Sequence, residues 1–342
     1  ILNLSSGPSG LAYYPGTGLS EHFDGRFFLC DFRGAANGSG VRTFRVREKG
    51  AFYEVADEEE TLWNILATDV EFGPDGGVYV SDWVNGWTGL NKGRIYRFAD
   101  PEAAASPIVA EVKQLLSEDL TKKQPADLAK LLAHRDRRVR QAAQFALVDL
   151  KQVDALSKVA ADLNVGRLGR LHAIWGLGQL ASNARTSGAE LATKAASIVA
   201  PLLDDGDAEV RAQSARVLGD ARHAASYDAL VKRLDDAHAR TRYFASVALG
   251  KLGRPSAIGA LLKLLADNDN QDPIVRHGAI VALARIGGWK LSTPVDGSAD
   301  TLTPEQTEAH KLLAATTRHP SAATRLGVTV ALRKLRSPLL AE

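Results

Sequence analysis

The segment DAEVRAQSARVLGDA, residues 207–221, decides the fold of most of this chain. Counting from Arg211, Ser214 stands three residues later and Leu218 seven residues later. This spacing puts them on one face of an α-helix. Asp207, four residues before the arginine, is of a type that caps helix N-termini. The segment therefore predicts a capped helix with one apolar face.

The same pattern recurs along the carboxy-terminal two thirds of the chain. Each copy has an arginine, a small or slim residue three positions later and a leucine seven positions later, and the intervals between arginines are 30, 41, 31, 34 and 49 residues. One such helix cannot bury its apolar face alone, so stacked neighbours must cover it. The arginines of this ladder are Arg140, Arg170, Arg211, Arg242, Arg276 and Arg325.

Three copies have the form Asp-x-x-Val-Arg, beginning at Asp136, Asp207 and Asp272. This form resembles the HEAT repeat. The resemblance implies an α-α superhelix of about six repeats over residues 108–342. The aspartates are expected to cap the helices, and the arginines to tie adjacent repeats together.

Residues 1–100 have a different pattern, and residues 101–107 read as a linker. Short β-like runs alternate with Gly, Pro and Asn turns. A strand, a turn and a second strand that ends in Asp plus an aromatic residue occur over residues 10–32 and again over 69–83. This is typical of a four-stranded propeller blade, and two blades are predicted. Since a propeller closes with about four to eight blades, we expect the sequence to be a piece of a longer chain.

Composition excludes several classes of protein. Lys plus Arg outnumber Asp plus Glu by only 42 to 40, with both signs interspersed, so no nucleic-acid partner is expected. No apolar run is long enough to span a membrane. The single cysteine, Cys30, excludes an internal disulfide and any multi-thiolate metal site, and its apolar flanks predict a buried strand thiol.

The sequence has only weak matches to motifs for cofactor or metal binding. Residues 176–181 fit a dinucleotide fingerprint but lie inside a repeat helix, and residues 267–272 lack the glycine and glutamate of a calcium loop. No cofactor or metal site is therefore expected in this chain. In the β region the ends of strands are where propellers gather ligand groups, and the weak candidates for a site are Arg33, Asp69 and Asp82, with Asp31, Trp83 and Lys92 beside them. Turn chemistry and blade packing are the preferred interpretation of these residues.

Residues 66–83, followed by 93–97, resemble the large membrane-bound dehydrogenases of planctomycetes, and Ser81-Asp82-Trp83 is the most specific part of the match. The resemblance implies a propeller like that of glucose and sorbosone dehydrogenases, then HEAT repeats, then a c-type haem domain that this chain lacks. For the parent protein it implies a periplasmic location, pyrroloquinoline quinone (PQQ) or Ca²⁺ in the propeller, haem c downstream and oxidation of a sugar or alcohol.

Two functions follow from this sequence. The first is a non-catalytic scaffold in which the HEAT repeats link a dehydrogenase-like propeller to an electron-transfer domain. The alternative is a protein-interaction module that binds a partner on its concave surface, for which an insertion at residues 287–304, containing Trp289, is a candidate loop. The side chains expected to point outward on that surface are Gln141, Gln144, His172, Gln213, Arg216, Tyr243 and His277. An enzyme complete in itself is the least favoured reading.

Overall fold

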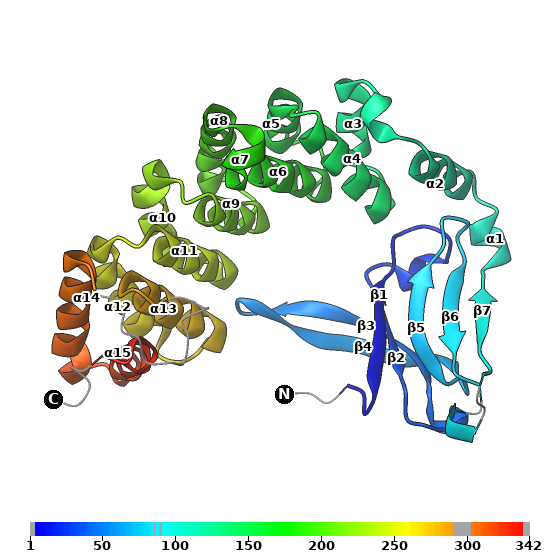
Figure 1. Cartoon of the computed structure of the whole chain (residues 1–342), viewed down its shortest axis with the longest axis horizontal. Coiled ribbons are helices and arrows are strands. Elements are labelled where there is room, and N and C mark those ends of the chain that lie inside the picture. The colour runs from blue at the N-terminus through cyan, green and yellow to red at the C-terminus, as the bar shows by residue number, and fades with distance from the viewer. Residues whose placement is uncertain (1–3, 85, 89–90, 290–301, 338–342) are drawn as a thin grey trace. The chain divides into compact units, whose positions relative to one another are not determined.

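The computed structural model is shown in Figure 1, and it describes residues 4–84, 86–88, 91–289 and 302–337. The chain divides into two compact units: residues 1–49 with 53–146, and residues 50–52 with 147–342. The first unit contains the β-sheets and the second contains most of the helices. Among the described residues, no helix is both long and apolar enough to cross a membrane.

The first unit begins with a four-stranded sheet in the order β1-β2-β3-β4. Strand β2 pairs antiparallel with both β1 and β3. Cys30, predicted to lie in a strand, falls on β2. The bounds are β1 (Pro8–Tyr13), β2 (Phe27–Asp31), β3 (Gly40–Lys49) and β4 (Phe52–Trp63).

A second sheet has three antiparallel strands, β5 (Ala67–Phe72), β6 (Val78–Asp82) and β7 (Arg94–Phe98). The turn between β5 and β6 is built on Asp75, whose carboxylate accepts hydrogen bonds from the Gly77 amide at 3.1 Å and the Tyr79 hydroxyl at 2.9 Å. Gly76 in this turn has a φ of +78°, which favours glycine. Asp75, Gly76 and Gly77 therefore form the hairpin turn between β5 and β6.

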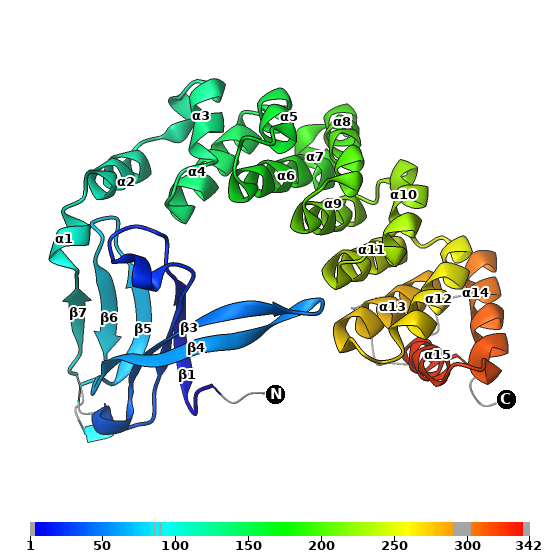
Figure 2. The same ribbon diagram turned by 180° about the vertical axis from the view of Figure 1, so that it is seen from behind.

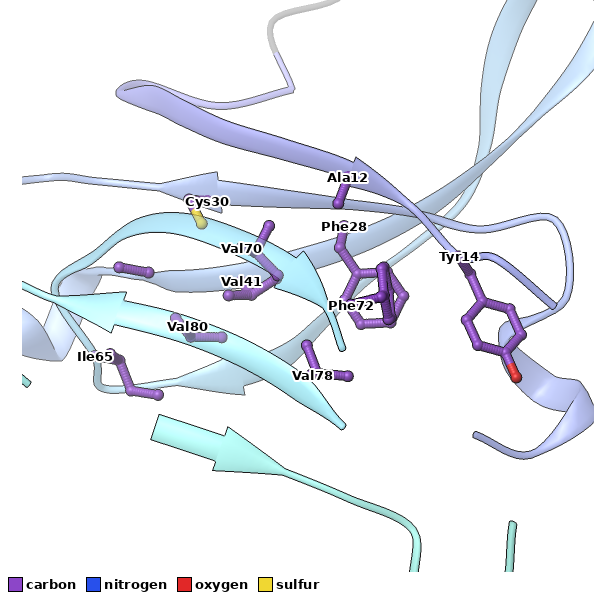
Figure 3. Close-up of a cluster of buried hydrophobic side chains, with 11 residues drawn as sticks. Ala12, Tyr14, Phe28, Cys30, Val41, Ile65, Val70, Phe72, Val78 and Val80 are labelled. Atoms are coloured by element: carbon purple, nitrogen blue, oxygen red, sulfur yellow. The ribbon is translucent and has the colours of Figure 1, made fainter. Parts of the chain in front are cut away.

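The two sheets pack on each other, with β1 against β5, around one apolar core (Figure 3). Phe28 and Phe72 meet edge to face with ring centroids 5.0 Å apart. Gly10 allows the close approach, because a Cβ there would lie 2.6 Å from the Asp69 Cα. Cys30 is fully buried in this core, as predicted, and burial raises its thiol pKa to about 12.

The propeller prediction is not confirmed. The first sheet has four strands in sequence order, and the second sheet, which packs on it, has three. The described strands, however, form two open sheets and no closed ring, since a ring needs about four blades at least. What the structure establishes is a small antiparallel β region ahead of the helices.

The first helices of the chain belong to the same unit as the sheets. Three of them begin with proline, which favours the first helical turn. Arg138 donates to the carbonyl oxygens of Phe72 at 2.9 Å and Gly73 at 3.1 Å, so α4 is fixed to the end of β5. The bounds are α1 (Pro101–Ala104), α2 (Pro107–Ser117), α3 (Pro125–Leu131) and α4 (Arg137–Asp149).

The second unit is a stack of helices in two layers, seen from both sides in Figures 1 and 2. Five ladder arginines lie on the inner layer, which is formed by α6 (Arg167–Ser182), α9 (Ala208–Asp220), α11 (Ala239–Leu252), α13 (Pro273–Ile286) and α15 (Ala322–Leu335). The outer helices are α5 (Val153–Ala161), α7 (Ala184–Ser187), α8 (Ala189–Val199), α10 (Tyr227–Lys232), α12 (Ile258–Asn268) and α14 (Pro304–Ala315).

Glycines eight residues after the arginine set the spacing between inner helices. A Cβ on Gly219 of α9 would lie 2.6 Å from the Cβ of Ala248 on α11. A Cβ on Gly250 of α11 would lie 2.6 Å from the Cα of Ala282 on α13. Gly178 on α6 faces Val217 on α9 in the same way. Gly178 belongs to the segment 176–181 that fits a dinucleotide fingerprint, and here it makes a packing contact between two helices.

We expect Gly219→Ala to destabilise the second unit by about 1–3 kcal/mol, because overpacked helices must move apart. The matched control is Gly259→Ala on α12, where no atom lies within 4 Å of the added methyl group. There, alanine should be neutral or stabilising by up to about 1 kcal/mol. Urea unfolding midpoints measure both changes, and equal midpoint shifts in the two variants would refute the packing argument.

Candidate interaction surface

Four of the ladder arginines donate hydrogen bonds to carbonyl oxygens in the turn that precedes their own helix. Nη1 of Arg211 donates to the carbonyl oxygens of Asp205 at 2.9 Å and Gly206 at 3.2 Å. These carbonyls lie six and five residues before the arginine. They stand outside the helix, so they take no part in its backbone hydrogen bonds. The same pair of contacts recurs at Arg140, Arg242 and Arg325.

Two of the arginines also reach the next repeat. Nε and Nη2 of Arg211 hold the carboxylate of Asp236 at 2.8 and 2.9 Å, and Asp236 lies in the turn before α11. Arg170 holds Asp205 in the corresponding turn before α9. The aspartates predicted as caps do cap two inner helices, since Asp207 accepts amide hydrogen bonds from α9 and Asp272 from α13. One row of ion pairs therefore joins adjacent repeats.

Asp236 should make the stability of the second unit depend on pH. Burial alone would raise its pKa, but hydrogen bonds from Arg211 and the His238 amide, with the charges of Arg211 and Arg233, hold the pKa below its ordinary value. A lowered pKa stabilises the fold above the ordinary range of aspartate, near pH 4, and this contribution is lost as the pH falls below it.

We therefore expect Asp236→Asn to lower the free energy of unfolding by about 1–3 kcal/mol at pH 7. The difference from the unsubstituted chain should shrink as the pH falls below about 4. Urea unfolding at several pH values tests this. Asp228→Asn, at an exposed position of α10, is the control and should show no such pH-dependent difference. A gap for Asp236→Asn that stays constant between pH 7 and pH 3 would contradict the prediction.

The inner face of the stack is defined by helix geometry. With about 100° per residue, positions two before and two, five and nine after the arginine lie opposite the buried positions three, seven and ten. On α6, α9 and α11 these positions place aromatic and polar side chains in one band. We call this band the inner ridge, formed by Trp175, Glu209, Gln213, Arg216, Arg240 and Phe244.

Hydrogen bonds link the inner ridge across three helices. Trp175 Nε1 on α6 donates to Gln213 Oε1 on α9 at 3.0 Å, and Gln213 Nε2 donates to Glu209 at 2.6 Å. Arg240 Nε on α11 donates to both carboxylate oxygens of Glu209, at 3.2 and 3.0 Å. The first and last of these contacts connect neighbouring repeats, and the bond from Gln213 to Glu209 lies within α9.

Phe244 is the aromatic centre of the ridge. The guanidinium carbons of Arg240 and Arg216 lie 5.0 and 6.0 Å from its ring centroid, and the Tyr243 ring lies 5.0 Å away. Arg216 is exposed and Phe244 is half-buried. A ring with two cations beside it thus faces solvent on α11.

The structure places the predicted surface residues unequally. Gln141, Arg216 and His277 are exposed and Tyr243 is half-buried. The remaining three, Gln144, His172 and Gln213, are only 5%, 6% and 2% exposed, so they offer little free surface.

The reasons for this burial lie in contacts between helices. Gln213 is enclosed between Trp175 and Glu209, and the His172 ring packs edge-on against Trp175 with centroids 5.1 Å apart. Sequence reasoning missed Trp175, Glu209 and Phe244. The signal that could have revealed them is their spacing from the ladder arginines, two residues before or two or five residues after.

In the first unit, the strand-end candidates are engaged in ion pairs. Asp31 is completely buried and binds Arg33 Nη2 at 2.7 Å, Arg42 Nε at 2.9 Å and the Ser5 hydroxyl at 2.8 Å. Although burial would raise the pKa of Asp31, these hydrogen bonds lower it below its usual range. Arg33 is therefore committed to Asp31.

The second blade-like copy repeats this arrangement. Asp82 is 8% exposed and pairs with Arg94 Nε at 3.2 Å. Phe32 and Trp83, the aromatic residues that follow the two aspartates, stack with centroids 5.6 Å apart. Asp69 is exposed and its carboxylate accepts a local hydrogen bond from the Val70 amide at 2.9 Å, and Lys92 is exposed. Within the described part of the chain, no group of three or more His, Cys, Asp or Glu residues is placed to hold a metal ion.

Comparison with known proteins identifies the helical repeats. A family model described as HEAT repeats matches residues 195–284 and 228–304. These residues include α9 to α13, so the chain contains a helical repeat solenoid of the HEAT or armadillo type. The search of curated proteins found no match.

Solved structures similar to the chain are repeat proteins at low identity. An engineered protein is 20% identical, with a TM-score of 0.39, covering 63% of this chain and 98% of its own. A designed armadillo repeat protein in complex with the peptide (KR)4 is 19% identical, with a TM-score of 0.38 and coverages of 62% and 100%. The complex of CpcE and CpcF of phycocyanin lyase from Nostoc sp. PCC7120 is 19% identical, with a TM-score of 0.37 and coverages of 66% and 94%.

Proposed function

We propose that this chain is a protein-interaction scaffold whose HEAT repeats bind a polypeptide partner on the inner ridge. The observation that carries the proposal is the set of hydrogen bonds from Trp175 through Gln213 and Glu209 to Arg240. Because these side chains are already held in place, binding would cost little further ordering of the protein.

The chemistry of the inner ridge suits a polypeptide. Aromatic residues and arginine are the types enriched at binding hot spots. Phe244 and Trp175 offer apolar contact, whereas Arg216, half of whose side chain is exposed, offers hydrogen-bond donors to carbonyl or carboxylate oxygens. Stacked repeats supply the extended surface on which a chain can lie.

Selection of binders from a random-peptide library on the whole chain, followed by calorimetry, tests the proposal. Phe244→Ala and Arg216→Ala should each lower the binding affinity of the selected peptides by about 30-fold. This is the effect of losing a hot-spot contact of about 2 kcal/mol. Lys232→Gln, at an exposed position of the outer helix α10, should leave the affinity unchanged. Peptides that bind all three variants equally would exclude the inner ridge as the site.

The resemblance of residues 66–83 to planctomycete dehydrogenases supports a larger role as a second proposal. In such a periplasmic parent, the repeats would link a sugar or alcohol dehydrogenase-like propeller to an electron-transfer domain, and PQQ, Ca²⁺ and haem c would belong to that parent. The paired strand ends Asp31-Phe32 and Asp82-Trp83 are the structural observation in its favour.

The full-length natural gene product decides this second proposal. We expect a c-type haem spectrum and turnover of a sugar or alcohol with an artificial electron acceptor. Arg33→Ala in that protein should reduce turnover. A natural product without haem and without turnover would remove the redox role and leave the interaction scaffold.

A further inference from the structure

A pocket of about 510 Å³ lies at the carboxy-terminal ends of α9, α11 and α13. Three of its side chains, Asp220, Lys251 and Arg285, stand nine residues after their ladder arginines and so occupy one row of inner-facing positions. The other polar and aromatic side chains in its wall, among the described residues, are Arg222, Trp289 and Gln306. Nothing in the proposed function uses this pocket.

The charges in the wall do not cancel. Lys251 Nζ binds the carboxylate of Asp220, which neutralises that pair. Arg222 and Arg285 form no ion pair with any other residue of the described segments. In addition, Nη1 of Arg285 is closed to solvent and has no hydrogen-bond partner. Within the described residues, the pocket therefore has two guanidinium groups without an acidic partner.

The helix ends account for only part of this positive charge. Each helix C-terminus carries about half a negative charge, which favours nearby cations. Several terminal carbonyls are already bonded, however: Leu249 O accepts from the Gly253 amide at 3.1 Å, and Leu283 O accepts from the Gly287 amide at 3.1 Å. The buried Nη1 of Arg285 still has no hydrogen-bond acceptor, because a helix dipole supplies charge but no acceptor atom. An incoming oxyanion would provide charge and acceptors together.

Trp289 forms the aromatic wall of the pocket. The Trp289 amide donates to Ala284 O at 2.9 Å, which ties it to α13. Gly288 has a φ of +101°, and a Cβ there would lie 2.9 Å from the Gln306 side-chain amide. The buried His310 ring contacts Gly287 O through Nε2 at 3.0 Å. Lys334 Nζ lies 4.9 Å from the Trp289 ring centroid and adds a further positive charge nearby.

We propose that this pocket binds an oxyanion, a carboxylate or phosphoryl group. Arg222 and Arg285 donate hydrogen bonds to its oxygens, and the planar guanidinium is suited to bidentate contact with such groups. The Gln306 amide supplies a neutral donor, and Trp289 packs against the apolar part of the ligand. The proposal does not depend on the inner ridge, because a free anion can occupy the pocket by itself.

Titration of the whole chain with inorganic phosphate and, separately, with glutarate tests the proposal, at constant ionic strength. The indole N–H signal of Trp289 in nitrogen-15 NMR spectra is the readout, assigned by its loss in Trp289→Phe. We expect a saturable shift of this signal. The double variant Arg222→Gln/Arg285→Gln should weaken binding by about tenfold or more, the effect of losing charged hydrogen bonds. Lys232→Gln, which removes one positive charge from an exposed position of α10 outside the pocket, is the control and should bind as the unsubstituted chain does.

Each outcome has a definite meaning. Saturation by phosphate alone assigns a phosphoryl ligand, and saturation by glutarate as well shows that a carboxylate suffices. A linear shift without saturation, or equal affinity in the double variant, overturns the proposal. If the glutamine variant does not fold, Arg222→Lys/Arg285→Lys replaces it. That variant keeps both charges, and we expect it to bind more weakly because it loses the bidentate geometry.

Discussion

The close approach of the inner helices is the constraint on which the helical unit depends. Gly178, Gly219 and Gly250 each leave room for a residue of the next helix where any side chain would collide. This contact sets the distance between repeats, and with it the reach of every side chain that crosses from one repeat to the next. The hydrogen bond from Trp175 to Gln213 and the ion pair from Arg240 to Glu209 both need that short distance.

The arginine ladder complements this packing at the other end of each helix. A guanidinium that binds two turn carbonyls, as that of Arg211 does, satisfies groups that the helix leaves unpaired. Arg211 and Arg170 also bind an aspartate of the next repeat. Such buried ion pairs add little stability on balance, but breaking one leaves an unpaired charge. They therefore fix the register between repeats more than they stabilise the stack.

Charge compensation separates structural from ligand-binding groups in this protein. In the β region, Asp31 and Asp82 are buried and matched by arginines on neighbouring strands, so their charges are used within the fold. In the helical unit, Arg222 and Arg285 have no such match within the described residues and line a pocket. Ligand binding is thus expected where the fold leaves charge and hydrogen-bond donors unused.

The sequence by itself determined the helical repeats and their register, because the spacing of Arg211, Ser214 and Leu218 can only form one face of a helix. It also determined the short strands and the burial of Cys30. Helix geometry gives the direction of a side chain but not how deeply the neighbouring helices enclose it. Gln213 therefore points away from the core and is nevertheless buried. Likewise, Arg285 became part of a pocket only because stacking brings the ends of separate helices together. The tertiary structure alone decided which polar groups found partners and which remained available.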